Sequence, residues 1–284
     1  MRELSFIALE DSDVQTFLAS FHVAKKTINK MIRNHELAIN GQEINSNMAF
    51  KKDDLITVAY YETTNIKPYF QKIKIAYEDD DIIVINKAPS LLIHSDGNSD
   101  QTLDNMVYAY FLQKNETINP RHLHRLDVDT SGLVVYAKHL LAHAFLNYQM
   151  EQGFIQKRYY AVVEGIMANK QGIINLPIGR NRHQSKQFIV SKQGKPALTE
   201  YRVLKEVNHQ SLLAISLHTG RTHQIRVHFA HLHHPLVGDQ LYGQSSSRLM
   251  LHAYFLEFIH PRTRKPLQVV TTIPEDFIIK NEED

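Results

Sequence analysis

The 284-residue chain contains no cysteine, and this absence excludes disulfide bonds and thiolate metal sites. Long apolar runs are missing as well, because no stretch approaches the roughly 18 residues that a membrane helix needs. The first residues, MRELSFIALEDSD, meet acids before any long apolar run, so we expect no signal peptide. Internal repeats and low-complexity tracts are also absent. Together these features predict a cytoplasmic protein without a membrane anchor.

The residues that are present are typical of a globular protein, with 43% hydrophobic and 22% charged. The net charge of +2 conceals an uneven distribution. Residues 74–127 carry five Lys/Arg and nine Asp/Glu, whereas residues 157–226 carry twelve Lys/Arg and three Asp/Glu. The local excess of nine positive charges in the second stretch indicates a polyanionic partner such as nucleic acid, although a solvated basic face would look the same.

The first sixty residues have the pattern of a small α/β module. Apolar residues recur at helical spacing in DVQTFLASF and AKKTINKMIRNHE. Asn40-Gly41 then separates two short apolar runs, as in a two-residue hairpin, and DDLITVAYY is typical of a closing strand. We therefore predict a module at residues 1–62, a linker at 63–72 that contains Pro68, and a larger domain at 73–284.

The larger domain mixes strands and helices without a regular βαβ alternation. IAYEDDDIIVINKAP is expected to be one strand bounded by acids, and TLDNMVYAYFLQ a helix that Thr102 caps. HLLAHAFLNYQM and RTHQIRVHFAHL have helical spacing, whereas GLVVYAK, KRYYAVVEG, ALTEYRVLKEV, SLLAISLHT and LMLHAYFLEFIHP are typical of strands. This order predicts an α+β domain with a mixed, largely antiparallel central sheet flanked by helices.

The stretch RHLHRLDVDTSGL, residues 121–133, holds the carboxylate of Asp127 between a basic run and a tight polar turn. Burial would favour the neutral acid, whereas a neighbouring guanidinium keeps it ionised. An ionised, oriented aspartate can act as a nucleophile or as a base. A turn cap or a structural salt bridge is the alternative explanation for an aspartate in this position.

The stretch HTGRTHQIRVHFAHLHHPLVGDQLYG offers two arginines, Arg221 and Arg226, as partners for a carboxylate or for phosphates. Gly220 permits a sharp turn, and Thr222 is expected to cap the helix that follows. Five histidines lie between residues 223 and 234, but none has an acid at a helical ligand spacing. We expect these histidines to make polar contacts near RNA, with a metal site as the less favoured reading.

Two further groups fit a nucleic-acid site. Tyr159 and Tyr160 of QKRYYAVVEG face opposite sides of a predicted strand, so one of them can line a pocket and stack on a base. Lys26, Lys30 and Arg33 share one face of a predicted helix and can contact phosphates. Half-buried sheet tyrosines and a solvated helix face are the simpler explanations for each group alone.

In combination these segments resemble the RluA family of pseudouridine synthases. The likeness runs from about residue 75 to about residue 275 and rests on HRLDVDTSGL, KRYYAVVEG, PIGRNRHQSK, GKPALTEYRVL and TGRTHQIRVHFAHLHHPLVGDQLYG, in that order. AKKTINKMIRNHELAINGQEI resembles the small RNA-binding module first known from ribosomal protein S-four. The resemblance implies the pseudouridine synthase fold and the isomerisation of uridine in structured RNA.

The resemblance also implies roles for three residues. Asp127 would be the catalytic aspartate, Tyr159 would stack on the target base and take the proton from its carbon 5, and Arg221 would pair with the aspartate. It implies no cofactor, no metal and no obligate protein partner. We expect large-subunit ribosomal RNA to be the substrate, with transfer RNA as the alternative. The residues expected to contact RNA are Lys26, Lys30, Arg33, Arg125, Arg180, Arg182, Lys186, His223 and Arg226.

Two positions depart from the family pattern. Ala88 precedes Pro89 and Ser90 stands where the family often has glycine, which puts the shape of that turn in question. Val128 follows the aspartate where a charged residue is common. Two other functions remain open at this point: a non-catalytic RNA-binding or ribosome-assembly protein with the same fold, and a histidine-rich metal hydrolase.

Overall fold

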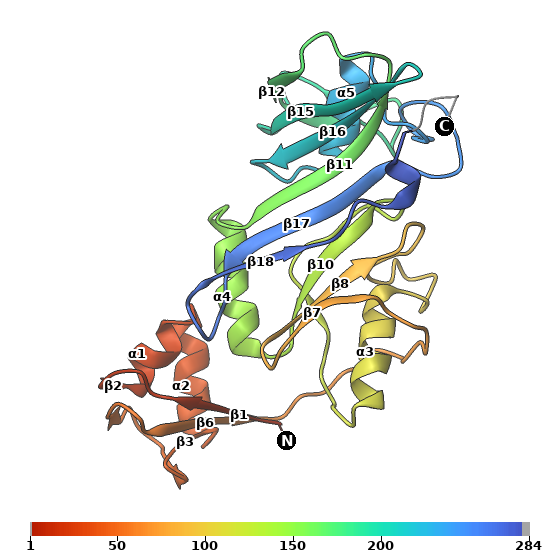
Figure 1. The fold of residues 1–284 in the computed structure, drawn as a ribbon. Coiled ribbons are helices and arrows are strands. Elements are labelled where there is room, and N and C mark those ends of the chain that lie inside the picture. Colours follow the sequence, from red (N-terminus) through yellow and green to blue (C-terminus); the bar gives the residue numbers. More distant parts are fainter. Residues whose placement is uncertain (1, 280–284) are drawn as a thin grey trace.

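A computed structural model describes residues 2–279, so residue 1 and residues 280–284, the outer ends of the two predicted domains, lie outside it. Figure 1 shows a small N-terminal unit at one end of a long sheet, which is formed by the rest of the chain. Between the two units, residues 61–74 contain neither helix nor strand. No helix within residues 2–279 has the length and apolar character needed to cross a bilayer.

The N-terminal unit has two helices and two small sheets. Its elements are β1 (Arg2–Ile7), β2 (Ser12–Asp13), α1 (Val14–Ala19), α2 (Lys25–Arg33), β3 (Leu37–Ile39), β4 (Gln42–Glu43), β5 (Ala49–Phe50) and β6 (Leu55–Tyr60). The larger sheet has the order β1-β6-β3-β4, and β2 pairs with β5. Both predicted helices are confirmed. Asn40 and Gly41, with φ of 50° and 79°, form the predicted hairpin turn between β3 and β4.

The second unit contains three α-helices and the long sheet. Its elements are β7 (Ile75–Glu78), β8 (Ile82–Lys87), α3 (Leu103–Gln113), β9 (Arg121–His122), β10 (Ser131–Ala137), α4 (Leu140–Glu151), β11 (Gln156–Glu164), β12 (Gln171–Asn175), β13 (Ile178–Arg180), β14 (Phe188–Val190), β15 (Leu198–Val207), β16 (Gln210–Leu217), α5 (Gln224–His231), β17 (Leu251–Ile259), β18 (Pro266–Val270) and η1 (Glu275–Phe277).

The long sheet confirms the predicted α+β class. Its strand order is β12-β15-β16-β11-β17-β10-β8-β7, with β9 paired to β10 and β18 to β17. Among the described strands, only β10 and β17 run parallel. Helices α3 and α4 pack on opposite faces of β8 and β10, and α5 packs on the face of β11 and β16 that carries Tyr159 (Figure 1). The apolar core is therefore divided among several clusters along the sheet.

One predicted strand is wrong, because IAYEDDDIIVINKAP forms two strands, β7 and β8, joined by a turn. The carboxylate of Asp79 accepts hydrogen bonds from the backbone N–H of Asp81 and Ile82 at 2.8 and 2.9 Å, and these bonds stabilise a tight turn between the two strands. The predicted cap of α3 is confirmed, since the Thr102 side chain accepts from the Asn105 backbone N–H. The sequence patterns did not indicate the strands β1, β2, β5, β9, β12, β13, β14 and β18.

The N-terminal unit is packed against α4 and the loop between β17 and β18. Phe145 of α4 belongs to the same apolar cluster as the core of the N-terminal unit. The guanidinium of Arg264 lies 4.3 Å from the ring centroid of Phe21 and 4.1 Å from that of Phe145. The Arg262 guanidinium lies 4.2 Å from the ring centroid of Phe6. Shared apolar packing and cation–π contacts thus hold the two units together.

Candidate active site

A cleft of about 610 Å³ opens between the segment before β10, strand β11 and the turn that leads from β16 into α5. Its polar lining includes Asp127, Tyr159, Arg221, His223 and Arg226. These five residues come from three segments that are far apart in the sequence. The volume is in the range of small-molecule and cofactor sites.

The turn that carries Asp127 is held from the side of β10. The Thr130 N–H donates to the Asp127 carbonyl at 3.1 Å, and β10 begins one residue later. Gly132 has a φ of +116°, and a Cβ at this position would overlap the backbone of Ala253 in β17. Glycine is therefore required where β10 runs beside its parallel neighbour, which explains the TSG sequence after the aspartate.

The fully buried side chain of Lys87 supports the same turn. The Nζ of Lys87 donates to the carbonyl oxygens of Ala88, Leu91 and Val128, each at 2.9 Å. Burial lowers the pKa of Lys87 to about 8, although the negative charges of Asp129 and then Asp127 oppose this shift. Lys87 was not among the residues predicted for the site. The available signal was a lysine that directly follows an apolar strand and directly precedes the Ala-Pro turn.

Asp127 lies beside the guanidinium of Arg226. The distance from Arg226 Nη1 to Asp127 Oδ2 is 3.4 Å, and His223 Nε2 lies 3.8 Å from the same oxygen. Arg226 is itself held by the buried Asp239, to which Nε and Nη2 donate at 2.8 and 2.7 Å. Burial disfavours the charged guanidinium, but Asp239 and Asp127 outweigh this effect and raise the pKa of Arg226. The result is a fixed positive group next to the carboxylate.

The predicted pairing of Asp127 with Arg221 is therefore wrong. In the part of the chain that the structure describes, Arg221 lines the cleft but its Nε donates to the Pro196 carbonyl at 2.8 Å, and no ion pair joins it to Asp127. The reason is the position of α5. Arg221 lies in the turn before the helix, whereas Arg226 lies in the first turn of the helix and reaches the aspartate.

Two smaller expectations about this segment also change. The N-cap of α5 is His223, with a left-handed φ of 56°, and not Thr222. Arg226 was expected to contact phosphates, but only 4% of its surface is exposed and two carboxylates already engage its guanidinium. His223 stays in the cleft, where its Nδ1 lies 2.8 Å from the hydroxyl oxygen of Tyr242.

The structure places Tyr159 and not Tyr160 in the cleft. Tyr159 is 7% exposed and belongs to the apolar cluster on the α5 side of the sheet. Tyr160 points to the other face, where its ring stacks on Tyr254 with a centroid distance of 3.9 Å. Burial, followed by the charge of Asp127, raises the pKa of the Tyr159 hydroxyl. Among residues 2–279 this hydroxyl has no hydrogen-bond partner, so it is available to a bound molecule.

The remaining basic residues expected to bind RNA are exposed, but they do not form one group. Arg125 lines the cleft, with its Nη1 3.3 Å from His94 Nε2. Three belong to β13 or to the loop between β13 and β14, and three to α2 of the N-terminal unit; they are Arg180, Arg182, Lys186, Lys26, Lys30 and Arg33. The β13–β14 hairpin reaches the cleft through the ring of Phe188, whose centroid lies 5.7 Å from that of His223.

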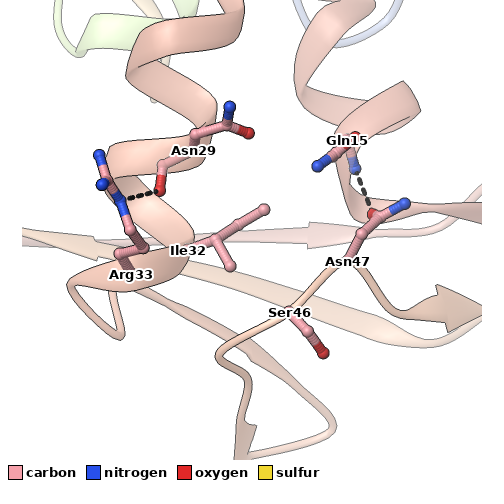
Figure 2. A pocket seen from close by; sticks show the side chains of 6 residues that line it. All are labelled: Gln15, Asn29, Ile32, Arg33, Ser46 and Asn47. Atoms are coloured by element: carbon pink, nitrogen blue, oxygen red, sulfur yellow. Dashed lines mark hydrogen bonds between the residues drawn. The ribbon is translucent and has the colours of Figure 1, made fainter.

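A separate groove of about 370 Å³ lies on the N-terminal unit. Figure 2 shows its lining, with Arg33 and Asn29 from α2 on one side and Gln15 and Asn47 on the other. Asn47 Oδ1 accepts from the Gln15 N–H at 3.0 Å, and Arg33 Nε donates to the Asn29 carbonyl at 3.2 Å. Of the three basic residues predicted on α2, Arg33 therefore lines a polar groove.

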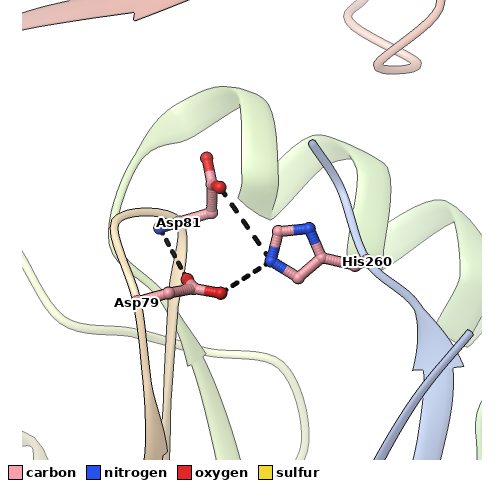
Figure 3. Close-up of side chains that lie close together, drawn as sticks. All are labelled: Asp79, Asp81 and His260. Atoms are coloured by element: carbon pink, nitrogen blue, oxygen red, sulfur yellow. Dashed lines mark hydrogen bonds and ion pairs between the residues drawn. The ribbon is translucent and has the colours of Figure 1, made fainter. Parts of the chain in front are cut away.

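Of the histidines between residues 223 and 234, His223, His228 and His234 make separate hydrogen bonds. His228, for example, contacts the Thr199 hydroxyl and the Leu176 carbonyl, each at 2.9 Å. Within the described residues, the one set of side chains close enough to share a metal ion lies elsewhere and comprises Asp79, Asp81 and His260 (Figure 3).

The carboxylates of that set already have hydrogen-bond partners within the protein. The guanidinium of Arg262 donates to both carboxylate oxygens of Asp81, at 2.8 and 2.9 Å. His139 Nε2 lies 2.7 Å from Asp81 Oδ1, and His260 Nε2 lies 2.7 Å from Asp79 Oδ2. The cluster near the N-terminal unit is therefore an internal charge network, with its carboxylates engaged by cationic and imidazole groups.

Comparison with known proteins gives consistent results. Residues 81–231 match the family model described as RNA pseudouridylate synthase. The chain is 36% identical to the uncharacterised RNA pseudouridine synthase YhcT of Bacillus subtilis, over 97% of this chain and 95% of that protein. It is 33% identical to the ribosomal large subunit pseudouridine synthase D of Haemophilus ducreyi, over 90% and 85% of the two chains. The structure is similar to that of human RNA pseudouridylate synthase domain containing 1, with a TM-score of 0.63, 28% identity and coverage of 75% and 87%.

Proposed function

From the premise that this chain belongs to the RNA pseudouridylate synthase family, we propose that it isomerises specific uridines of large-subunit ribosomal RNA, with Asp127 as the catalytic group. The family match establishes the reaction class, an isomerisation of uridine in RNA. The printed name of the Haemophilus ducreyi relative supports ribosomal RNA as the substrate, and transfer RNA is the alternative. The observation that carries the proposal for the site is the convergence of Asp127, Arg226 and Tyr159 in one cleft.

The reaction breaks the bond between ribose carbon 1′ and uracil N1, turns the base, and joins carbon 1′ to carbon 5. Carbon 5 loses one proton and N1 gains one, so the product is an isomer of uridine. An ionised carboxylate supports two routes to the first step. Asp127 either attacks carbon 1′ and displaces the uracil anion, or removes a proton from the ribose. Both routes need a charged, oriented carboxylate, and Arg226 at 3.4 Å supplies the positive partner.

Tyr159 fits the role of base partner. Its ring lies in the cleft wall and can stack on the uracil, as aromatic side chains do with unpaired bases. Its raised pKa means that the hydroxyl is protonated at neutral pH. It can therefore take the proton from carbon 5 only by releasing its own proton, and the cleft provides Asp127 as a nearby carboxylate acceptor.

The uridine must leave the base stack before it can reach Asp127, at a cost of about a few kcal/mol that is smallest in loops. Exposed cations around the cleft and on the β13–β14 hairpin would bind the flanking phosphates. We assign this role to Arg125, Arg180, Arg182 and Lys186, with His223 contacting the nucleotide inside the cleft. Such binding weakens as the salt concentration rises, because each phosphate contact releases counterions.

We further propose that residues 1–62 are an S-four-like RNA-binding module, that residues 63–72 are a linker, and that residues 73–284 are the catalytic domain. Exposed Lys26 and Lys30, together with Arg33 at the groove of Figure 2, would contact the RNA outside the cleft. Because the module is packed against α4, its basic helix has a defined position relative to the cleft.

The test is the Asp127→Asn variant, incubated with large-subunit ribosomal RNA and with transfer RNA from cells that lack the gene. Pseudouridine is then mapped at nucleotide resolution. We expect wild type to restore pseudouridine at defined sites of the ribosomal RNA and Asp127→Asn to bind this RNA but form none. Asp80→Asn, an exposed carboxylate in the β7–β8 turn, should behave as wild type. Substantial turnover by Asp127→Asn would refute the catalytic role, and products confined to transfer RNA would refute the substrate.

A further inference from the structure

Lys157 lies in the wall of the active-site cleft, on the same face of β11 as Tyr159, and the chemistry described above does not use it. Its Nζ lies 3.8 Å from the sulfur of Met150, a residue in the last turn of α4. The amine also lies against the turn between β16 and α5, because a Cβ at Gly220 would be 3.6 Å from Nζ. Three elements thus enclose this ammonium group.

The group has no partner for its charge. Within residues 2–279, no carboxylate lies at ion-pair distance from Lys157, and the thioether sulfur of Met150 is a weak acceptor. By contrast, Lys87 donates to three carbonyls, and Lys138 contacts Glu78 and the Asp79 carbonyl. A partly buried amine whose acceptor is only a thioether leaves most of its hydrogen-bonding capacity unused, and in a cleft a bound molecule can supply the stronger acceptor.

The surroundings of Lys157 favour an anion. Burial, followed by the charges of Lys157 and His122, lowers the pKa of His124 to about 3, so this imidazole is neutral. Its Nε2 accepts from the Val135 N–H at 3.4 Å. Arg221 adds a guanidinium, and so a second positive group, to the lining on the side of the β16–α5 turn. This part of the cleft is therefore positive, whereas Asp127 makes the other part negative.

We propose that Lys157 binds a backbone phosphate next to the uridine in the cleft and thereby orients the nucleotide, with its ribose toward Asp127. The inference rests on the proposed function and adds a positioning residue to it. A compact ammonium on a flexible stem is suited to binding a phosphate as a point charge. A phosphate is repelled from the carboxylate of Asp127 and attracted to the amine, so the two charges fix the direction in which the nucleotide lies.

The experiment compares Lys157→Met, Lys157→Arg and wild type. The probe is fluorescein-labelled single-stranded U12, in which no base has to leave a duplex. Its dissociation constant is measured by fluorescence anisotropy from 50 to 300 mM NaCl. Lys265→Gln, an exposed lysine outside the cleft, is the matched control. Thermal unfolding is followed by circular dichroism, and turnover is measured on large-subunit ribosomal RNA.

We expect Lys157→Met to weaken binding about tenfold at 50 mM NaCl, and to reduce the slope of log K against log [NaCl] by about 0.7, the value for one phosphate contact on a single strand. Lys157→Arg should keep the wild-type slope. The melting temperature of Lys157→Met should be unchanged or higher, since the substitution removes a partly buried charge that has no carboxylate partner.

A Lys157→Met variant with the wild-type salt slope would overturn the assignment, whether or not turnover is lost, because the amine would then contact the base or only the protein. A clear fall in melting temperature without a change in slope would assign Lys157 a structural role instead. Absence of pseudouridine formation by wild type would refute the proposed function. The salt slopes would still report on the phosphate contact, so the two failures are distinguishable.

Discussion

Lys87 offers a direct test of how the turn before β10 is supported, through the Lys87→Met substitution. Its pKa of about 8 lies below the ordinary lysine value of 10.5, because burial penalises the charged amine in the folded protein. Below pH 8 the amine is protonated in both the folded and the unfolded chain. Between pH 8 and 10.5 the folded protein loses this proton first, so the free energy of unfolding rises with pH.

The size of the effect follows from the two pKa values. Their difference corresponds to about 3 kcal/mol of unfolding free energy gained between pH 8 and pH 10.5. Lys87→Met has a similar volume but no titrating group, so this gain should disappear. The variant should also be less stable at neutral pH by about 3 kcal/mol or more, because three carbonyls at 2.9 Å lose their donor. Turnover should fall further than RNA binding, since the Val128 carbonyl adjoins Asp127.

The assay is urea unfolding followed by circular dichroism at pH 7.5 and pH 10.5, for wild type, Lys87→Met and the exposed control Lys265→Met. Tyrosines and other groups that titrate in this range contribute alike to all three proteins, so the difference between their pH increments isolates Lys87. We expect the control to keep the wild-type increment. An equal increment in Lys87→Met would refute the reasoning, because another group would then account for the pH dependence.

Three further predictions concern the site and the contact between the units. Arg226→Lys should reduce single-turnover pseudouridine formation at least 100-fold and destabilise the fold by about 1–3 kcal/mol, because a lysine cannot make the two-point contact to the buried carboxylate of Asp239. Arg221→Lys should reduce the same rate less than tenfold, and equal losses in the two variants would contradict the assignment of Arg226 as the partner of Asp127. Gly132→Ala should lower the unfolding free energy, measured by urea unfolding, by about 3 kcal/mol or more, because residue 132 has a positive φ and the new Cβ would overlap the backbone of Ala253. Wild-type stability of this variant would show that β10 and β17 do not require glycine at this position. Arg264→Ala should speed proteolytic cleavage within residues 61–74 because two cation–π contacts, worth about 1–2 kcal/mol together, are lost; an unchanged cleavage rate would show that apolar packing alone holds the N-terminal unit.

Elements with a local cause were predicted correctly. The Asn40-Gly41 turn and the helix capped by Thr102 depend on neighbouring residues, and the buried strand at residues 131–137 is marked by its own continuous apolar run. The single strand expected at residues 75–89 failed because a side chain, that of Asp79, closes a turn that periodicity does not reveal. The missed strands have two to six residues, and β1, β12, β13, β14 and β18 each form because a partner strand is adjacent.

Within the candidate site, Asp127 and Tyr159 were predicted from motifs, and the structure brings both into one cleft. Their catalytic roles stay predictions. The choice between Arg221 and Arg226 depended on where α5 begins and on Asp239, which the motif analysis left without a role. The exposed basic residues on α2 and on the β13–β14 hairpin likewise remain predictions.

The sequence by itself determined the family, the α+β class and the two motif side chains that meet in the cleft, Asp127 and Tyr159, because motif identity and local hydrogen bonding are written in consecutive residues. Only the tertiary structure decided which guanidinium faces Asp127, that Lys87 donates to three carbonyls, and that the Lys157 ammonium has only the weak acceptor sulfur of Met150. The physical reason is that the state of a charge depends on the groups within a few ångströms of it. For these side chains those groups come from segments that lie far apart along the chain.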